Sequence, residues 1–340
     1  MKTLVAGWFS FEQGHGTAGD LLAGELACDW LESAGYSYDI AVDPPFCGGI
    51  NWRFADPKNY SLVVFVCGPF QKGELEAEFL AHFAGCRLIG LDLTMLERLD
   101  EWNPFDVLLE RDSSVCARPD ITFLSPRKLV PVVGVCLVEP YGAMEEVAHA
   151  AIWRLVASRS VAVVKIDTRL DTNITDLRSP SEIESLLARM DLVVTTRLHG
   201  TVLALKNGVP TISIDPEAGG AKIIRQAQKI GWPVVFAVDN VTDEALQQAL
   251  DYCLSEDARI KARACCQRAK KMVEEARDEF ITALGCDPAA IDRSEDSKYA
   301  NINRISVDLD RYAPSDDLQT SRGMRGKMKI ILKSIIGRSR

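Results

Sequence analysis

The chain has 340 residues, with 39 Lys and Arg against 48 Asp and Glu, which gives a formal net charge of −9. It is 47% hydrophobic and 26% charged, a composition that excludes a disordered or low-complexity chain. No apolar run reaches the roughly 18 residues that a membrane-spanning helix needs. The length allows one large domain or two ordinary ones.

Positive charge gathers at the C-terminal end, where residues 322–340 carry seven Lys and Arg and no acid. Removing these seven charges from −9 leaves −16 on residues 1–321. Because phosphate binding needs clustered cations, we expect no nucleic-acid partner for this acidic body. The ten cysteines show no CxxC spacing and do not pair with the four histidines. We therefore expect reduced thiols in a cytoplasmic protein, and no metal site.

The N-terminal half alternates short apolar runs with helical patterns. The first apolar run is broken by Gly7 and Ser10, which predicts a strand rather than a signal peptide. The predicted strands are Thr3–Trp8, Tyr38–Val42, Leu62–Cys67, Arg87–Leu91, Val107–Leu109 and Ile121–Leu124, and the predicted helices are Asp20–Ser33 and Glu74–Phe83. Two prolines around basic residues in the segment SPRKLVP, residues 125–131, indicate a linker.

The second half repeats this alternation. Ser179 and Pro180 predict a helix start, as cap and first-turn residue. The predicted strands are Val132–Leu137, Val161–Ile166, Leu192–Thr195, Val209–Ile214 and Val234–Ala237. The predicted helices are Met144–Ala157, 180–188, 200–205, a helix from Gly220 to Lys229, and two helices within Asp243–Leu284.

This pattern predicts an α/β fold with parallel sheets, built as two Rossmann-like, doubly wound domains that face a cleft. The N-terminal domain is expected over residues 1–127 and the C-terminal domain over residues 128–286, followed by a polar linker and basic tail over residues 287–340. Since ligands of such sheets bind beyond the C-terminal ends of the strands, the loops after strands are the places to look for chemistry.

A glycine motif follows the first strand: Gly14-His15-Gly16-Thr17-Ala18-Gly19. It has the GxGxxG form of a dinucleotide fingerprint. However, residues 10–13 separate it from the strand, whereas the fingerprint turns directly off the strand. A plain flexible loop and a cleft-lining loop, with His15 and Gly19 against substrate, stay open as alternatives. Asp20 either works in the site or simply caps the helix.

The second motif is Asp191-Leu-Val-Val-Thr-Thr-Arg197-Leu198-His199-Gly200. An apolar strand ends, Arg197 and His199 stand in the turn, and Gly200 is expected to begin a helix. A guanidinium and free helical N–H groups form a site for carboxylate or phosphate, and a histidine can move a proton near neutral pH. The alternative is structural: Arg197 pairs with an acid and His199 packs between sheet and helix.

The third motif, Asp215-Pro-Glu217-Ala-Gly219-Gly220-Ala-Lys222, follows the next strand. Lys222 is expected in the first turn of a helix, where a cation opposes the helix dipole unless an anion is bound. We therefore assign Lys222, Gly219 and Gly220 to substrate binding, with a solvent-exposed lysine as the alternative.

With these motifs, residues 179–232 resemble the polysaccharide pyruvyl transferase family. The resemblance rests on Ser179-Pro-Ser-Glu-Ile, the Asp191–Gly200 block, Leu205-Lys-Asn-Gly-Val-Pro-Thr-Ile, and Lys222 before a helix ending in Lys-Ile-Gly231. Ala18-Gly19-Asp20 fits the Gly-Asp pair that the family often has near its N-terminus. The resemblance implies a fold like that of GT-B glycosyltransferases, and transfer of a carboxyvinyl unit from phosphoenolpyruvate to a sugar as a pyruvate ketal.

The resemblance also implies roles for these residues. Arg197, Lys222, Gly200 and the other helix N-terminal groups would hold the carboxylate and phosphate of phosphoenolpyruvate. His199 would transfer a proton or contact phosphate, and Asp20 would orient or deprotonate the acceptor. Phosphoenolpyruvate is then a co-substrate, and no cofactor or metal is needed. The chain departs from the family where Glu139 follows a strand, since members often place an Arg there.

The basic tail has Met324, Met328, Ile331 and Ile335 at helical spacing among lysines and arginines. This pattern predicts an interfacial helix drawn to anionic lipid, which suits a lipid-linked glycan acceptor at the cytoplasmic face of a membrane. A helix docked on the acidic body and a disordered end are the alternatives.

Two other functions stay open for the whole chain. One is a GT-B glycosyltransferase that uses a nucleotide sugar, with Glu217 available for the ribose hydroxyls. The other is a non-catalytic glycan-binding or assembly protein on the same scaffold.

Overall fold

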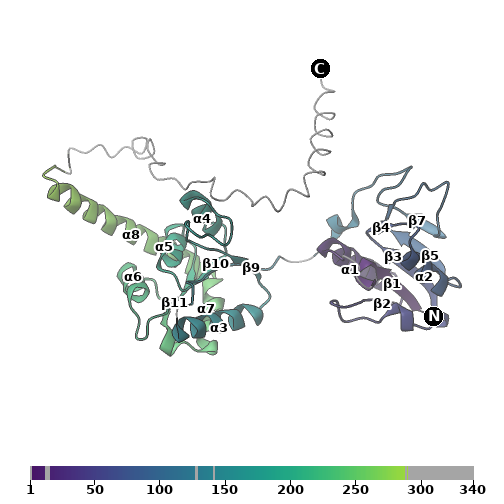
Figure 1. Cartoon of the computed structure of the whole chain (residues 1–340), viewed down its shortest axis with the longest axis horizontal. Coiled ribbons are helices and arrows are strands. Elements are labelled where there is room, and N and C mark those ends of the chain that lie inside the picture. The colour runs from purple at the N-terminus through teal and green to yellow at the C-terminus, as the bar shows by residue number, and fades with distance from the viewer. Residues whose placement is uncertain (1, 12–15, 127–128, 141, 288, 290–340) are drawn as a thin grey trace, which may run out of the picture. The chain divides into compact units, whose positions relative to one another are not determined.

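A computed structural model describes residues 2–11, 16–126, 129–140, 142–287 and 289 (Figure 1). The chain divides into two compact units, Met1–Lys128 (unit 1) and Leu129–Arg340 (unit 2). The sequence analysis predicted the boundary between the two domains after residue 127. The tail predicted over residues 322–340 lies outside the described residues. Among the described helices, none is both long and apolar enough to cross a membrane.

Unit 1 contains a five-stranded, wholly parallel sheet. Its strand order is β2-β1-β3-β5-β7. The strands are β1 (Lys2–Gly7), β2 (Tyr38–Ile40), β3 (Tyr60–Val66), β5 (Arg87–Leu91) and β7 (Val107–Leu109), and the helices are α1 (Ala18–Ser33) and α2 (Glu74–His82). Two residues each of β4 (Pro69–Phe70) and β6 (Thr94–Met95) pair as a small second sheet.

Alternating side chains of the unit 1 strands face two different cores. Val64 and Val66 of β3 pack in one cluster with Ala23 and Ala27 of α1. Phe65 belongs to the opposite cluster, which contains Phe79 of α2. Helices therefore cover both faces of the sheet, as the prediction of a doubly wound domain requires.

Unit 2 repeats the design with the strand order β12-β11-β10-β8-β9, again all parallel. The strands are β8 (Val132–Cys136), β9 (Ala162–Lys165), β10 (Leu192–Thr195), β11 (Thr211–Asp215) and β12 (Val235–Ala237). The helices are α3 (Ala143–Ala157), α4 (Pro180–Leu187), α5 (Leu198–Lys206), α6 (Lys222–Ile230), α7 (Asp243–Cys253) and α8 (Glu256–Ala283).

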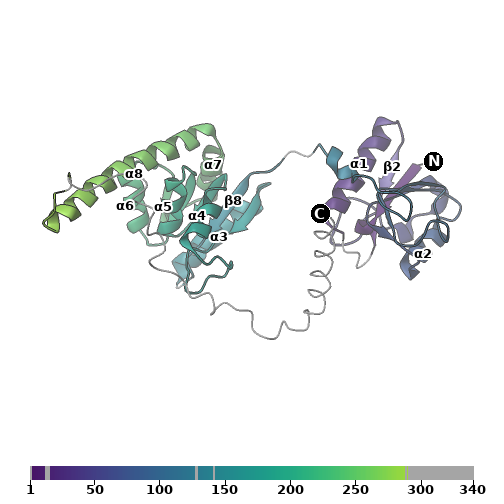
Figure 2. The same ribbon diagram turned by 90° about the horizontal axis from the view of Figure 1, so that it is seen from above.

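The unit 2 sheet is also covered on both faces. Leu192 and Val194 pack with residues of α3 and α7, whereas Val193 between them packs with residues of α4 and α5. The long helix α8 packs on α5 and α6 through its first half. Its last turns extend away from the rest of unit 2 in both views (Figures 1 and 2).

The predicted strands and helices match the observed elements apart from end residues, with one exception. Ile121–Leu124 was predicted as a strand and is wrong, because it forms a 3-10 helix. Asp120 caps this turn by accepting a hydrogen bond from the Thr122 N–H, and Phe123 is 85% exposed. Ile121 packs partly against the core that α1 covers, but none of the described sheet pairings includes this segment. The short strands β4 and β6 were not predicted, since two residues give no periodic signal.

Each sheet has one place where successive connections leave in opposite directions. In unit 1 it lies between β1 and β3, and in unit 2 it lies between β8 and β10. The loops beyond the carboxyl ends of such strand pairs splay apart, which makes this switch point the usual ligand crevice of an open parallel sheet.

Candidate functional site

The turn after β10 brings the predicted Arg197 to the switch point of unit 2. Thr195 is fully buried, donates its hydroxyl hydrogen bond to the Cys136 carbonyl at 2.7 Å, and accepts one from the Arg197 N–H at 2.9 Å. Thr196 accepts a hydrogen bond from the Val138 N–H at 2.8 Å. The two threonines thus fasten the ends of β8 and β10 together and fix where Arg197 stands.

The Arg197 side chain is only 14% exposed and points at the loop after β8. Its Nε donates to the Leu137 carbonyl at 2.7 Å, and its Nη2 lies 2.9 Å from Glu139 Oε2 and 3.5 Å from Asp167 Oδ1. The guanidinium that we expected to hold an anion is therefore already paired with two acids, as the structural alternative proposed. This pairing fixes the orientation of Arg197 and reduces the local positive charge.

Glu139 bridges two arginines at this site. Its Oε1 accepts a hydrogen bond from Arg169 Nη1 at 3.1 Å, and Arg169 also pairs with Asp171. Desolvation raises the pKa of Glu139, but its own backbone N–H, Arg169 and Arg197 outweigh desolvation and lower the pKa overall. Glu139 is therefore an ionised carboxylate at neutral pH, in the place where a cation was expected from the family pattern.

Helix α5 begins at Leu198, two residues earlier than predicted, so His199 and Gly200 lie in its first turn. His199 is exposed, which excludes the alternative that it packs between sheet and helix. Within the described residues no side chain caps this helix. Gly200 is buried, and a Cβ there would lie 2.3 Å from Thr195 Oγ1, so glycine is needed for α5 to approach β10. Its substrate-binding role stays a prediction.

The N-terminus of the next helix, α6, is differently arranged. Asp215 is fully buried, and its Oδ2 accepts hydrogen bonds from the N–H groups of Ala221, Ile223 and Ile224 at 2.7, 3.0 and 3.2 Å. The negative charge that we expected a bound anion to supply beside Lys222 is thus supplied by Asp215. Lys222 itself is the exposed first residue of α6. Its contact with substrate stays a prediction.

Gly219 and Gly220 shape the loop that leads into α6. Their φ angles are 75° and 78°, the left-handed region that favours glycine. The Gly219 N–H donates to Asp239 Oδ1 at 3.1 Å, and a Cβ on Gly220 would lie 2.0 Å from Ile224 Cδ1. Backbone conformation explains both glycines, and their predicted substrate contact is untested.

A cavity of about 260 Å³ opens beside Arg197 at the switch point. Its wall includes Glu139 and Asp167 from the loops after β8 and β9, and His149 and Trp153 from α3. Lys165 lies over the Trp153 ring, with its Nζ 5.4 Å from the ring centroid. Thr175 and several apolar side chains complete the wall, the apolar ones being Val135, Leu137, Val138, Pro140, Ile166 and Ile174.

In unit 1, the predicted Asp20 caps the helix that contains it. Asp20 is 7% exposed, and its Oδ2 accepts hydrogen bonds from the backbone N–H and the hydroxyl of Thr17, both at 2.7 Å. The Thr17 hydroxyl in turn accepts one from the Asp20 N–H, which completes a capping box. Gly19 lies in the same first turn, and His15 lies outside the described residues. The catalytic and binding roles predicted for these residues are untested.

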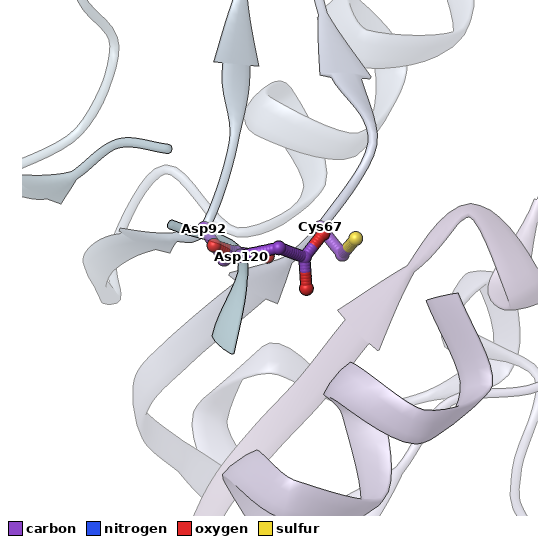
Figure 3. A group of neighbouring side chains, drawn as sticks. All are labelled: Cys67, Asp92 and Asp120. Atoms are coloured by element: carbon purple, nitrogen blue, oxygen red, sulfur yellow. The ribbon is translucent and has the colours of Figure 1, made fainter. Parts of the chain in front are cut away.

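A second cluster of unit 1 lies just beyond β3 and β5, and sequence analysis did not identify it. Ligand-type atoms of Cys67, Asp92 and Asp120 all lie within 4.8 Å of one another (Figure 3). Nη1 of Arg111 lies 2.8 Å from Asp120 Oδ2, 3.9 Å from Asp92 Oδ2 and 3.7 Å from Cys67 Sγ. The guanidinium therefore supplies the positive charge that a metal ion would otherwise bring to these three groups.

Burial dominates the chemistry of this cluster. Asp92 is 2% exposed, and desolvation together with the charge of Asp120 raises its pKa to about 6. Desolvation and the carboxylates of Asp20 and Asp92 raise the pKa of the Cys67 thiol to about 12. Cys67 and Asp92 also have φ angles of 62° and 58°, which are uncommon for residues other than glycine. The thiol stays protonated at neutral pH and is a poor nucleophile.

Asp167 and Asp92 were not identified from the sequence, and Glu139 was noted there only as a departure from the family pattern. All three acids follow a strand by one to three residues. A search for charged residues directly after every predicted strand would have found all three. Nothing in the sequence pairs them with Arg197 or Arg111, because those partners come from other strands of the sheet.

The family model for polysaccharide pyruvyl transferase matches residues 114–217. The match confirms the predicted resemblance over less than a third of the chain. It runs from the end of unit 1 to the residues just after β11, and it contains Glu139, Asp167, Arg197 and His199. Asp20 and Lys222 lie outside it. A search of curated protein sequences found no match.

Several solved structures are similar to the chain at low identity. The spinosyn rhamnosyltransferase SpnG with bound spinosyn aglycone is 15% identical, with a TM-score of 0.29, over 80% of this chain and 97% of that chain. The UDP-GlcNAc 2-epimerase of Methanocaldococcus jannaschii is 10% identical, with a TM-score of 0.28, over 80% and 99%. MurG of Acinetobacter baumannii is 10% identical, with a TM-score of 0.27, over 78% and 95%. Because these TM-scores are below 0.5, the fold assignment rests on the two sheets themselves.

Proposed function

Because residues 114–217 match the pyruvyl transferase model, we propose that the protein transfers a pyruvyl group from phosphoenolpyruvate to a sugar. The acceptor is a polysaccharide or its lipid-linked precursor, and the product is a pyruvate ketal. The observation that carries the proposal is the Arg197-Leu198-His199-Gly200 turn at the switch point of unit 2. The family match also supports a transferase as the class of enzyme.

The donor fits the groups at the start of α5. Phosphoenolpyruvate carries a carboxylate and a phosphate, and α5 offers N–H groups of its first turn that no described side chain caps. Arg197 stands at the same end of the helix with its orientation fixed by Leu137 and Glu139. Exposed His199 is accessible to a bound donor.

The reaction balances without an oxidant, a reductant or a further cofactor. A proton adds to C3 of phosphoenolpyruvate, which becomes a methyl group and leaves C2 electrophilic. One sugar hydroxyl forms a C–O bond to C2, the bond from C2 to the phosphate oxygen breaks, and a second hydroxyl closes the ketal. Of the two hydroxyl protons, one balances the proton on C3 and the other leaves with phosphate. In this proposal His199 transfers the proton and Asp20 of unit 1 orients the acceptor.

Calorimetric titration tests the donor assignment. The full-length protein is titrated with phosphoenolpyruvate, UDP, GDP and NAD, and the expected result is saturable binding of phosphoenolpyruvate alone. Arg197→Ala should weaken that binding at least tenfold, because a charge-assisted contact at a partly buried site is lost. Arg98→Ala is the matched control, since Arg98 is exposed and pairs with Asp100 in unit 1.

Two other outcomes would replace this proposal. Binding of UDP or GDP without phosphoenolpyruvate would favour a glycosyltransferase that uses a nucleotide sugar, with Glu217 available to the ribose. If Arg197→Ala and His199→Ala variants fold and support the biological role of the protein unchanged, a non-catalytic glycan-binding protein is the better assignment.

We also propose that the chain works in the cytoplasm at a membrane surface, through the basic segment 322–340. Its methionines and isoleucines at helical spacing among seven Lys and Arg are the supporting observation. Deletion of residues 322–340 should abolish co-sedimentation with vesicles that contain anionic phosphatidylglycerol. Equal sedimentation of the deleted and full-length chains would disprove the membrane contact.

A further inference from the structure

We propose that the cavity beside Arg197 binds one uncharged, hydroxyl-bearing sugar ring, with Trp153 against its apolar face and His149 accepting a hydroxyl hydrogen bond. The binding stands on the cavity alone, whereas its part in catalysis rests on the proposed pyruvyl transfer. This assigns a sugar subsite to unit 2, in addition to the acceptor role proposed for Asp20 in unit 1.

The size of the cavity favours a single ring. At about 260 Å³ it is slightly smaller than the roughly 300–1,000 Å³ typical of sites for drug-sized ligands. A whole nucleotide sugar is a larger ligand than such a space encloses. The cavity wall is apolar apart from a few polar groups, which is the usual pattern of a site that orients one small molecule.

The charges of the cavity favour an uncharged ligand. Its cations are Lys165 and Arg197, and its acids are Glu139 and Asp167, so the formal charges balance. His149 adds no charge, because burial lowers its pKa below the ordinary value and leaves the ring neutral at pH 7. An anion entering this space would meet both carboxylates, whereas the α5 N-terminus next to Arg197 has no capping acid among the described residues.

Acceptor atoms at the cavity can take further hydrogen bonds. Nε2 of His149 is buried and has no hydrogen-bond partner among the described residues. Each oxygen of Glu139 receives one hydrogen bond from an arginine and can accept another. A ligand with several hydroxyl groups supplies the missing donors, after a small rotation of the His149 ring toward the cavity. An unsatisfied buried nitrogen is costly, so such a ligand stabilises the site.

Trp153 provides the surface for the ring. It lies four residues after His149 on α3, so both side chains stand on one face of the helix, one turn apart. Trp153 is 36% exposed, and Lys165 holds the indole by a cation–π contact. The C–H face of a pyranose can pack on an indole while its hydroxyls reach Glu139 and His149. Because Arg197 belongs to the same wall, the ring lies next to the proposed donor site.

Saturation-transfer NMR on the full-length protein tests this site. The probes are the methyl pyranosides of glucose, galactose, mannose and N-acetylglucosamine, each titrated at millimolar concentration. At least one should give a saturable signal, and Trp153→Ala and His149→Ala should each weaken it at least fivefold. Trp30→Ala is the matched control, since Trp30 is a similarly exposed indole on α1 of unit 1.

Folding and the donor site are checked separately. Both α3 variants should keep the wild-type circular dichroism spectrum and should bind phosphoenolpyruvate as the wild type does. Arg197→Ala should instead weaken phosphoenolpyruvate binding more than pyranoside binding. If the alanine variant of Trp153 does not fold, Trp153→Leu takes its place. The inference is overturned if no pyranoside gives a saturable signal, or if binding survives both α3 substitutions. Pyranoside binding without phosphoenolpyruvate binding would instead overturn the proposed function and leave the sugar subsite standing.

Discussion

Each unit contains a cluster of one arginine and several carboxylates, and the acids of the two clusters differ in their pKa values. Arg111 in unit 1 and Arg197 in unit 2 each lie beyond the carboxyl ends of parallel strands. Arg111 pairs with three acids, Asp92, Asp112 and Asp120, whereas Arg197 pairs with two, Glu139 and Asp167. In unit 1 burial raises the pKa of Asp92 to about 6, whereas in unit 2 the arginines lower the pKa of Glu139. Asp92 is 2% exposed and lies 3.9 Å from its arginine, while Glu139 is 38% exposed on its side chain and lies 2.9 Å from its own.

The difference shows that hydrogen-bond geometry and solvent access decide the charge state of such a cluster, and its residue types do not. In the cluster of unit 1, Arg111 lies at hydrogen-bond distance from Asp120, whereas the buried Oδ2 of Asp92 has no hydrogen-bond partner among the described residues. The cluster of unit 2 lines a cavity and lies beside an uncapped helix N-terminus. We therefore assign Arg111 a role in the stability of unit 1. In unit 2, the cavity and the N-terminus of α5 leave room for a ligand beside Arg197.

The largest effect is expected from removing the arginine of unit 1. Arg111→Met leaves Asp92 and Asp120 without their cation and should lower the free energy of unfolding by about 2–4 kcal/mol, as for other broken buried pairs. Urea denaturation followed by circular dichroism measures the change. Arg98→Met, which breaks an exposed pair, should leave the free energy of unfolding nearly unchanged. Equal effects of the two substitutions would remove the structural role assigned to Arg111.

A smaller loss is expected where α5 approaches β10. Gly200→Ala places a Cβ 2.3 Å from Thr195 Oγ1 and should cost about 1–3 kcal/mol of stability. It should also weaken phosphoenolpyruvate binding, because the first turn of α5 must shift. Gly85→Ala is the control, since no atom lies within 4 Å of a Cβ there. Unchanged stability of the Gly200 variant would mean that the turn tolerates the shift.

The raised pKa of Asp92 predicts a stability difference that depends on pH. Between the unfolded value near 4 and the folded value of about 6, the native state keeps a proton that the unfolded chain loses. The wild type therefore loses stability from Asp92 as the pH rises through this window, and the loss is complete above pH 6. Asp92→Asn has no such loss.

Relative to the wild type, Asp92→Asn should gain about 1–3 kcal/mol between pH 4 and pH 8. Urea denaturation of both proteins at the two pH values measures this gain. Asp100→Asn serves as the control, because Asp100 is exposed and its pKa is lowered by Arg98. A difference between wild type and Asp92→Asn that does not vary with pH would contradict the buried, protonated carboxyl.

The smallest effect is expected at the acid of unit 2. Glu139→Gln keeps a hydrogen-bond acceptor for Arg197 and removes a negative charge beside the proposed donor site. Phosphoenolpyruvate binding should tighten roughly threefold to tenfold, with a weaker effect at high salt. Calorimetry at two ionic strengths measures it. Weaker binding in the variant would show that the charge of Glu139 is needed to position Arg197.

The sequence predicted most of what is local. Alternating apolar runs gave the five strands of each large sheet, and Ser179-Pro180 marked the start of α4, because these signals depend on neighbours along the chain. The Arg197–Gly200 turn was found because it follows an apolar strand. The strand predicted over Ile121–Leu124 was wrong, because apolar residues alone do not show whether a partner strand exists.

The tertiary structure decided which charges meet. Arg197 meets Glu139 and Asp167, 58 and 30 residues earlier in the chain, because β10 and β9 both pair with β8. Asp215, rather than a bound anion, accepts the hydrogen bonds of the N–H groups at the start of α6, and Asp20 caps α1. A residue type and its place after a strand are written in the sequence. Its charge state and its partners depend on the order of strands and on burial, which exist only once the sheet has formed.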